Sequence, residues 1–289
     1  MPTIHPVLGD TLYIAQEIDS LPTCDTVHIF KPDPSIHYHA FCDDFGPMNL
    51  AMIAQFIGQL DAELADNPSS MLFYCVDEGR RELTNAVFLL GAYMIMRLEI
   101  SADEVMDCFS WVNERLTEDY RDATFSAASF GLTLEDCWRG LAKGMQQGWV
   151  GVPCMYENEW GMVDMEEYSH YDDPLNGDLH EVVLGKFVAL QGPHDLGALD
   201  FSDDARGYRR FSPAHYVDIL HDFGVKTVVR LNEAEYDAGA FAEQGIAVLE
   251  LPFDDCAAPP PHVVEAFLAA VDGAGGGSVA VHCKAGLGR

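Results

Sequence analysis

The feature that most constrains the fold is an apolar run in the first half of the chain. Residues 86–98 are apolar on nearly every face of a helix, so the sequence predicts a helix enclosed by other elements. The part from Ala86 to Met96 falls well short of a bilayer span and contains Gly91. We therefore expect a buried helix of a globular domain and no membrane span.

Apolar, β-rich runs alternate with helical patterns along the sequence. The expected strands are residues 71–76, 185–190, 227–231, 247–251 and 278–282. The expected helices surround residues 50–64, 86–98 and 263–271. Such alternation is typical of an α/β fold in which helices cover a central sheet.

Further helix starts are marked by their capping residues. Ser101 and Thr133 each stand three residues before an acidic side chain, which is the pattern of a capping box. Ser212 is followed by Pro213, so we expect the serine to cap a helix and the proline to lie in its first turn. Gly224 is expected just past the end of that helix.

The chain is long enough for two domains, with an acidic segment between them. The 289 residues are 48% apolar, so a substantial core can be buried. Residues 157–178 hold eight Asp or Glu and no Lys or Arg, and they end in a turn-rich cluster. We expect an N-terminal domain at 1–156, an acidic linker at 157–184 and a C-terminal domain at 185–289.

A net charge of −31 limits the classes of molecule that the protein is expected to bind. Such a surface repels nucleic acid and anionic lipid and attracts basic segments, so neither nucleic acid nor membrane is an expected partner. Plain solubility, or adaptation to a salty environment, explains the charge equally well. The position of the acids is therefore more informative than their number.

The cysteines and the start of the chain favour a reducing compartment. The eight cysteines are scattered without a paired C-x2-C spacing, so we expect reduced thiols and neither a disulfide framework nor a zinc site. No basic segment precedes an apolar run at the start, so no secretory signal is expected. The expected location is the cytoplasm or the nucleus, and no metal or cofactor is expected.

The most informative chemical motif is the segment that follows the strand 278–282. It reads Cys283-Lys284-Ala285-Gly286-Leu287-Gly288-Arg289, a thiol and an arginine separated by five small or flexible residues. Successive backbone N–H groups in such a loop form an anion-binding nest that favours the thiolate over the thiol. Arg289 can hold two phosphate oxygens with its planar guanidinium.

Each residue around this loop has a functional and a plain structural interpretation. Cys283 is the expected nucleophile, attacking phosphorus to give a phosphocysteine; a lone cysteine at a strand end can also be a small buried hydrophobe. His282 is expected to orient the loop through hydrogen bonds and not through proton transfer. With Arg289 and the glycine loop beside it, we favour the catalytic interpretation of Cys283.

Hydrolysis of a phosphate ester also needs an acid for the departing oxygen. Asp254 and Asp255 follow the strand 247–251 and precede a proline-rich stretch, so either is a candidate acid on a stiff loop. An ordinary surface turn is the alternative. Cys256 is expected to be a bystander thiol, although its position would allow it to trap oxidised Cys283 as a disulfide.

A second C-x5-R spacing runs from Cys75 to Arg81, again after a strand and before a helix. Asp77 and Glu78 would sit where a phosphate should, and like charge opposes binding. We therefore interpret this segment as a degenerate copy of the same fold, with a second phosphate site as the minor alternative.

The chain resembles the Cdc14 family of dual-specificity protein phosphatases from about His37 onward. The resemblance is carried by residues 44–52, 90–93, 120–125, 176–178, 192–194, 228–232 and 279–289. It implies two phosphatase-like domains, of which only the second is catalytic, with an acidic linker helix between them. It also identifies Asp255 as the general acid, because residues 252–255 match the family's Phe-Phe-x-Asp.

The resemblance implies a substrate class as well. Family members act in the cell cycle and remove phosphate mainly from Ser-Pro sites that a basic residue follows, selected by an acidic groove. Asp172 matches one groove acid, whereas Ser169 stands in place of another, with Glu166, Glu167 and Asp173 close by. We expect the preference for basic residues to survive in a weaker or shifted form.

Family members continue past the arginine with a hydroxyl residue, a glycine and a long helix. We therefore expect the 289-residue chain to have little or no activity, while the gene product that contains it is a phosphatase. The alternative is an inactive fragment or pseudophosphatase that binds basic Ser-Pro partners. By resemblance, the expected locations include the nucleolus and the spindle or centrosome, and the oligomeric state is open.

Overall fold

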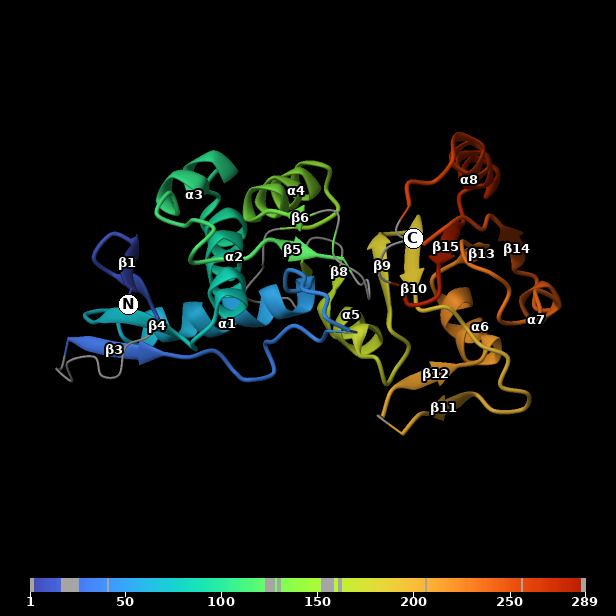
Figure 1. Cartoon of the computed structure of the whole chain (residues 1–289), viewed down its shortest axis with the longest axis horizontal. Helices are drawn as coiled ribbons and strands as arrows, with labels where there is room; N and C mark the ends of the chain where they lie inside the picture. The colour runs from blue at the N-terminus through green and yellow to red at the C-terminus, as the bar shows by residue number, and fades with distance from the viewer. Residues whose placement is uncertain are drawn as a thin grey trace. The chain divides into compact units, whose positions relative to one another are not determined.

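The computed structural model describes residues 3–16, 26–40, 42–122, 128, 131–151, 159–160, 163–205, 207–255 and 257–286. The chain divides into two compact units, Met1–Gly161 and Met162–Arg289 (Figure 1). Each unit contains a sheet and helices, as expected for an α/β protein. Across the described residues, none of the helices combines the length and the apolar character that a membrane crossing requires.

The first unit contains a four-stranded sheet of order β1-β2-β4-β3. Its strands are β1 (Thr3–Leu8), β2 (Leu12–Gln16), β3 (Val27–Phe30) and β4 (Met71–Val76). β4 pairs in parallel with β2 and with β3, whereas β1 pairs antiparallel with β2. The predicted strand 71–76 is therefore a central strand, as its apolar composition requires.

Four helices accompany this sheet. They are α1 (Leu50–Asp66), α2 (Arg80–Leu98), α3 (Ala102–Cys108) and α4 (Leu134–Gln146). The short strands are β5 (Tyr120–Arg121), β6 (Gly131–Leu132) and β7 (Glu159–Trp160). Both predicted capping boxes are confirmed, because Ser101 and Thr133 each exchange hydrogen bonds with the third helical residue.

Helix α2 is enclosed as its apolar sequence predicts. Every residue from Leu83 to Met96 is buried. Trp138 of α4 packs directly on Gly91, where a Cβ atom would lie 2.3 Å from the indole ring. The indole Nε1 donates to the carbonyl of Phe88 over 3.2 Å. Gly91 therefore allows two helices to approach closely at the centre of this unit.

The second unit is built on a five-stranded sheet of order β14-β13-β15-β10-β9 (Figure 1). These strands are β9 (Leu179–Val183), β10 (Phe187–Leu190), β13 (Val225–Arg230), β14 (Ala247–Glu250) and β15 (Ser278–His282). All neighbouring strands are parallel except the edge strand β9, which is antiparallel to β10. The carboxyl ends of four strands therefore meet at one edge of the sheet.

Helices contribute to the core on both faces of this sheet. The remaining elements are β8 (Val163–Asp164), α5 (Met165–Asp172), β11 (Phe201–Asp203), β12 (Arg209–Phe211), α6 (Pro213–Asp222), α7 (Gly239–Ala242) and α8 (Pro261–Gly273). Val228 packs in a cluster with Tyr216 of α6 and Phe241 of α7. The next residue, Val229, packs in a separate cluster with Phe267 of α8, because successive strand residues face opposite sides.

Two local expectations differ from the structure. Ser212 is the N-cap residue of α6, but its side chain makes no cap hydrogen bond, and its buried Oγ has no partner among the described residues. Within residues 157–184, expected to form a linker, α5 and β9 both lie in the second unit, where β9 is part of the sheet. β9 has only five residues and a mixed burial pattern, so its strand signal is weak.

Candidate active site

The candidate active site lies at the carboxyl edge of the sheet in the second unit. Strand β15 ends at His282, and Cys283 follows it directly. The chain after β13 is fixed to this edge, because Leu231 donates to the carbonyl of His282 over 2.9 Å. Phe253, beyond β14, donates in turn to the carbonyl of Leu231 over 3.3 Å. Carboxyl edges of parallel sheets are common positions for ligand sites.

Cys283 is buried and accepts a hydrogen bond from its own loop. Only 6% of the residue is exposed. Its Sγ lies 3.2 Å from the backbone nitrogen of Gly286, which donates to it. Gly286 has φ +76°, a value that favours glycine and that turns the backbone back toward the sulfur. The loop therefore directs one of its backbone N–H groups at the sulfur.

His282 is buried in a neutral form between two hydrogen bonds. Its Nδ1 lies 2.9 Å from the carbonyl oxygen of Cys283, and its Nε2 lies 2.8 Å from the hydroxyl of Tyr236. Burial lowers the pKa of His282 to about 4, so the ring is uncharged at neutral pH. Because a carbonyl can only accept, Nδ1 carries the proton and Nε2 accepts from Tyr236.

Glu235 bridges two residues beside the same loop. One carboxylate oxygen lies 3.1 Å from Nζ of Lys284, and the other lies 3.0 Å from Nδ1 of His194. Burial is the main reason that the pKa of His194 is lowered. Glu235 therefore connects the residue after Cys283 to the segment that follows β10.

Gly192 packs against the backbone of the loop. Its nitrogen donates to the carbonyl of Lys284 over 3.3 Å. A Cβ atom at this position would lie 2.2 Å from the carbonyl oxygen of Cys283. No side chain fits in that space, so a glycine is needed for the loop to adopt this conformation.

The predicted site residues fall into three groups. The structure brings His282, Cys283, Lys284, Ala285 and Gly286 together in one loop. Asp255 is exposed on the loop after β14, at the same edge of the sheet, and Asp254 is also exposed. Leu287, Gly288, Arg289 and Cys256 lie outside the described residues, so their assignments stay predictions.

Acidic residues of 164–181 lie beside β9. Near its start, Asp172 lies close to Asp178 and His180; burial is the main cause that raises the pKa of both aspartates to about 6. The contact of 3.9 Å between Asp172 and His180 is not an ion pair at neutral pH, because burial lowers the pKa of His180. The carbonyl of Asp178 accepts from Gln191 over 3.0 Å, which places this end beside the loop at Gly192.

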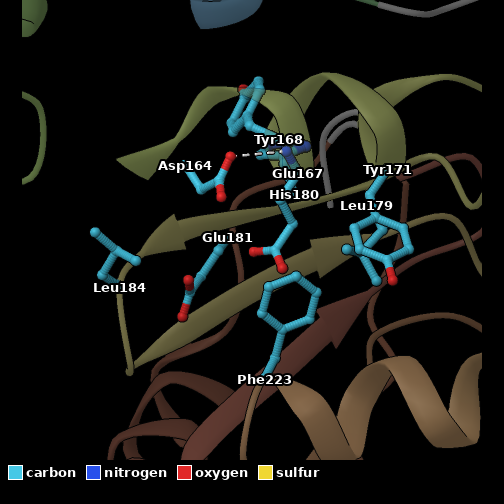
Figure 2. A pocket seen from close by; sticks show the side chains of 9 residues that line it. All are labelled: Asp164, Glu167, Tyr168, Tyr171, Leu179, His180, Glu181, Leu184 and Phe223. Atoms are coloured by element: carbon cyan, nitrogen blue, oxygen red, sulfur yellow. Dashed lines mark hydrogen bonds between the residues drawn. The ribbon is translucent and has the colours of Figure 1, made fainter. Parts of the chain in front are cut away.

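Glu167 also lies beside β9. It lines a small pocket together with Glu181 of β9, Tyr168 of α5 and Phe223 at the end of α6 (Figure 2). Glu166 is exposed one residue earlier, and the Oδ1 of Asp173 accepts a hydrogen bond from Leu175. Of the four predicted groove acids, Asp172 and Glu167 thus both lie beside β9, with His180 as a shared neighbour.

The second C-x5-R segment, in the first unit, is already engaged by its own neighbours. Burial raises the pKa of Cys75. Arg81 pairs with Asp43 and Glu118, at 3.2 and 3.0 Å. The side chain of Gln16 donates to the carbonyls of Asp77 and Gly79. These bonds leave no arginine for a phosphate, in agreement with a degenerate copy.

Sequence reasoning did not identify Tyr236, Glu235, Gly192 or His194 as site residues. Tyr236 is 46 positions from His282, and no local pattern links the two. Gly192-Pro193-His194 after a strand was a usable signal, since it marks a tight connection at the carboxyl edge. Within the described residues, no group of His, Cys, Asp and Glu is arranged to hold a metal ion.

Models of phosphatase families match both halves of the chain. Residues 6–144 match the model of the N-terminal half of dual specificity protein phosphatases. Residues 206–289 match a model described as a DSP-PTPase phosphatase of polymorphic toxin systems. Among solved structures, TpbA of P. aeruginosa aligns with 47% of this chain and 60% of its own, with 19% identity and a TM-score of 0.25.

Curated relatives match almost the whole chain. Dual specificity protein phosphatase CDC14C of Symphalangus syndactylus is 31% identical over 98% of this chain and 56% of its own length. Human CDC14A is 33% identical over 98% of this chain and 46% of its own. Tyrosine-protein phosphatase CDC14 of Saccharomyces cerevisiae is 29% identical over 92% of this chain and 47% of its own. The chain thus spans about half the length of these relatives, and it belongs to the Cdc14 family of dual-specificity protein phosphatases.

Proposed function

We propose that the second unit is a cysteine-dependent phosphatase in which Cys283 is the nucleophile. One observation carries the proposal, the hydrogen bond of 3.2 Å from the backbone of Gly286 to the sulfur of Cys283. That bond shows an inward-facing N–H group in the loop that must bind phosphate. The neutral His282 fits a role in holding the loop, since its lowered pKa makes it a poor proton donor at neutral pH.

The reaction has two steps in this proposal. The thiolate of Cys283 attacks phosphorus, the P–O bond to the alcohol breaks, and protonated Asp255 gives its proton to the departing oxygen. The resulting phosphocysteine is then attacked by water, whose proton passes back to the Asp255 carboxylate while the sulfur leaves as thiolate. The reaction as a whole consumes one water molecule for each phosphate released and uses no cofactor.

The loop residues and Arg289 would bind the phosphoryl oxygens. Backbone N–H groups of residues 284–288 supply the nest, and the Arg289 guanidinium would hold two oxygens as a planar fork. The role of Asp255 is supported by the sheet order, because β14, which precedes its loop, and β15, which precedes Cys283, both pair in parallel with β13 and end at the same carboxyl edge.

We further propose that the substrates are phosphoserine or phosphothreonine followed by proline, and phosphotyrosine, with a basic residue shortly after. The support is family membership together with the acids at 164–181. Asp172 is the predicted contact for the basic residue, since the resemblance matches it to a groove acid and it lies beside Asp178, whose carbonyl accepts from Gln191 at the carboxyl edge. A role in cell-cycle control, in the nucleus or cytoplasm, is part of this proposal.

Catalysis is tested on the gene product that contains this chain. Hydrolysis of p-nitrophenyl phosphate is expected for the wild type and should be lost in Cys283→Ser. Asp255→Asn should slow an alkyl phosphate far more than p-nitrophenyl phosphate, because nitrophenolate leaves without an acid. Turnover that survives Cys283→Ser would contradict the proposal. The 289-residue chain, measured in parallel, tests the expectation of low activity.

A non-catalytic docking role is the competing proposal, and the acidic composition of 157–178 favours it. Peptides with and without Arg or Lys after Ser-Pro separate the two roles. A phosphatase should turn over the basic peptide faster, and Asp172→Asn should reduce that difference. Binding of basic peptides without turnover, unchanged by phosphorylation, would support docking instead. Equal turnover of both peptides would contradict the acidic selection.

A further inference from the structure

Two consecutive residues outside the Cys-x5-Arg motif contact the residues on either side of Cys283. The hydroxyl of Tyr236 reaches Nε2 of His282, before the cysteine, over 2.8 Å. The carboxylate of Glu235 reaches Nζ of Lys284, after the cysteine, over 3.1 Å. We propose that this pair, the Glu235–Tyr236 clamp, positions the loop so that its N–H groups face the sulfur. The inference extends the proposed function, on which it rests.

The clamp is itself fixed through its backbone. The carbonyl of Glu235 accepts from the nitrogen of Asp195 over 2.9 Å. The carbonyl of Tyr236 accepts from Nη1 of Arg230 over 2.8 Å. The two donors, Asp195 and Arg230, belong to the second unit, which also contains Cys283. The clamp is therefore held by hydrogen bonds within the unit on which it acts. A fixed clamp can transmit its geometry to the residues that it contacts.

Arg230 makes this anchoring unusually stiff. Only 2% of this residue is exposed, and its guanidinium lies 4.7 Å from the centre of the Tyr236 ring. The same guanidinium pairs with Glu250 of the adjacent strand. A buried charge with a carboxylate, a carbonyl and an aromatic face as partners has little freedom to move. Tyr236 is therefore held on its ring face and at its carbonyl, and it contacts His282 through its hydroxyl and through a ring contact of 5.6 Å between centroids.

The two contacts act on the loop differently. The hydroxyl of Tyr236 donates to Nε2 of His282 and holds the ring in the orientation in which Nδ1 donates to the carbonyl of Cys283 over 2.9 Å. That bond sets the peptide plane after Cys283, from which the turn to Gly286 begins. Glu235 acts through Lys284, whose side chain is 64% exposed, so this contact should contribute less. Tyr236 and Glu235 are thus positioning residues and do not touch the reacting atoms.

Tyr236→Phe tests the clamp, because it removes the hydroxyl and keeps the ring on Arg230. The expected results are a changed ¹⁵N shift of His282 Nε2 and faster hydrogen exchange at the Gly286 amide. The rate at which iodoacetamide alkylates Cys283 at pH 7, measured on the proteolytic peptide that contains Cys283, should fall by about threefold to tenfold. Glu235→Gln should slow it by about twofold and provides a second variant with a more exposed side chain.

Tyr216→Phe is the matched control. Its hydroxyl is also buried and donates to a backbone carbonyl, that of Gly177, over 2.7 Å. It should leave the His282 shift, Gly286 exchange and alkylation rate unchanged. The clamp is overturned if Tyr236→Phe behaves like Tyr216→Phe in these three readouts. The proposed function is tested separately on the wild type. If inorganic phosphate does not protect Cys283 of the wild type from alkylation, the proposed function fails.

Discussion

The backbone nitrogen of Gly286 donates to the sulfur of Cys283 across 3.2 Å, which folds the loop back onto its first residue. The turn depends on the positive φ of Gly286, +76°. A phosphate bound in this loop would meet the N–H group of Gly286 that now faces the sulfur. The loop is therefore preorganised by its own backbone, and its surroundings decide whether this conformation persists.

Gly286→Ala should disturb this turn more than an alanine at a comparable glycine. A Cβ atom at Gly286 would lie 3.1 Å from the carbonyl oxygen of Leu190, in addition to the cost of a positive φ. Gly245 has φ +79° with open space around it, so Gly245→Ala shows the conformational cost alone. We expect Gly245→Ala to lose about 1 kcal/mol of unfolding free energy and Gly286→Ala to lose more, and only Gly286→Ala to slow alkylation of Cys283. Equal alkylation rates in the two variants would contradict this.

Gly192→Ala should reduce activity, because the added methyl group would displace the backbone of the loop that begins at Cys283. Its Cβ atom would lie 2.2 Å from the carbonyl oxygen of Cys283, so the loop backbone must move. A shift of about 1 Å is expected to cost roughly 100-fold in kcat/KM. Gly273→Ala, where a Cβ meets nothing within 4 Å, is the control and should retain activity. The idea fails if both alanine variants have the same kcat/KM.

The neutral state of His282 predicts a pH dependence of stability. Burial lowers its pKa from 6.5 to about 4, so between these values the unfolded chain binds more protons than the folded chain. The free energy of unfolding is therefore highest above about pH 6.5. Acidification from pH 6.5 to about 4 lowers it, through His282, by about 3 kcal/mol at most.

Hydrogen exchange of β15 amides between pH 4.5 and 7 measures this change in the second unit. His282→Asn removes the titrating ring, so the variant should show a smaller loss of protection on acidification than the wild type. The difference between the two pH curves isolates His282 from the other histidines. Parallel curves would show that His282 does not contribute.

Asp172→Asn should stabilise the fold at neutral pH while weakening selection of basic substrates. Burial, and then the like charge of Asp173, raises the pKa of Asp172 to about 6. A raised carboxyl pKa means that the ionised form destabilises the folded state above about pH 6, and that this cost disappears below about pH 4.

The side chain of Asp172 is 24% exposed, so we discount the shift and expect a gain of about 1–2 kcal/mol at pH 7. The gain should vanish toward pH 4. Asp218→Asn, at an exposed position of α6, should change stability little. A loss of stability in Asp172→Asn at pH 7 would contradict this prediction.

Local sequence signals predicted the elements of the second unit closely. The strand 278–282 has the predicted bounds, and the predicted strands 227–231 and 247–251 differ from β13 and β14 by no more than two residues at either end. The capping boxes at Ser101 and Thr133 were readable because their bonds span only three residues. Edge strand β9 was missed, since its five residues lack a continuous apolar run.

The sequence by itself determined the buried helix α2, the strand–thiol–glycine order around Cys283, and the family, because each depends on neighbouring residues or on matching stretches. Only the tertiary structure showed that Tyr236 and Glu235 hold the residues on either side of Cys283, and that Gly192 lies against its carbonyl. The physical reason is that parallel strands bring distant loops to one edge of a sheet, and the contacts made there leave no periodic trace in the chain.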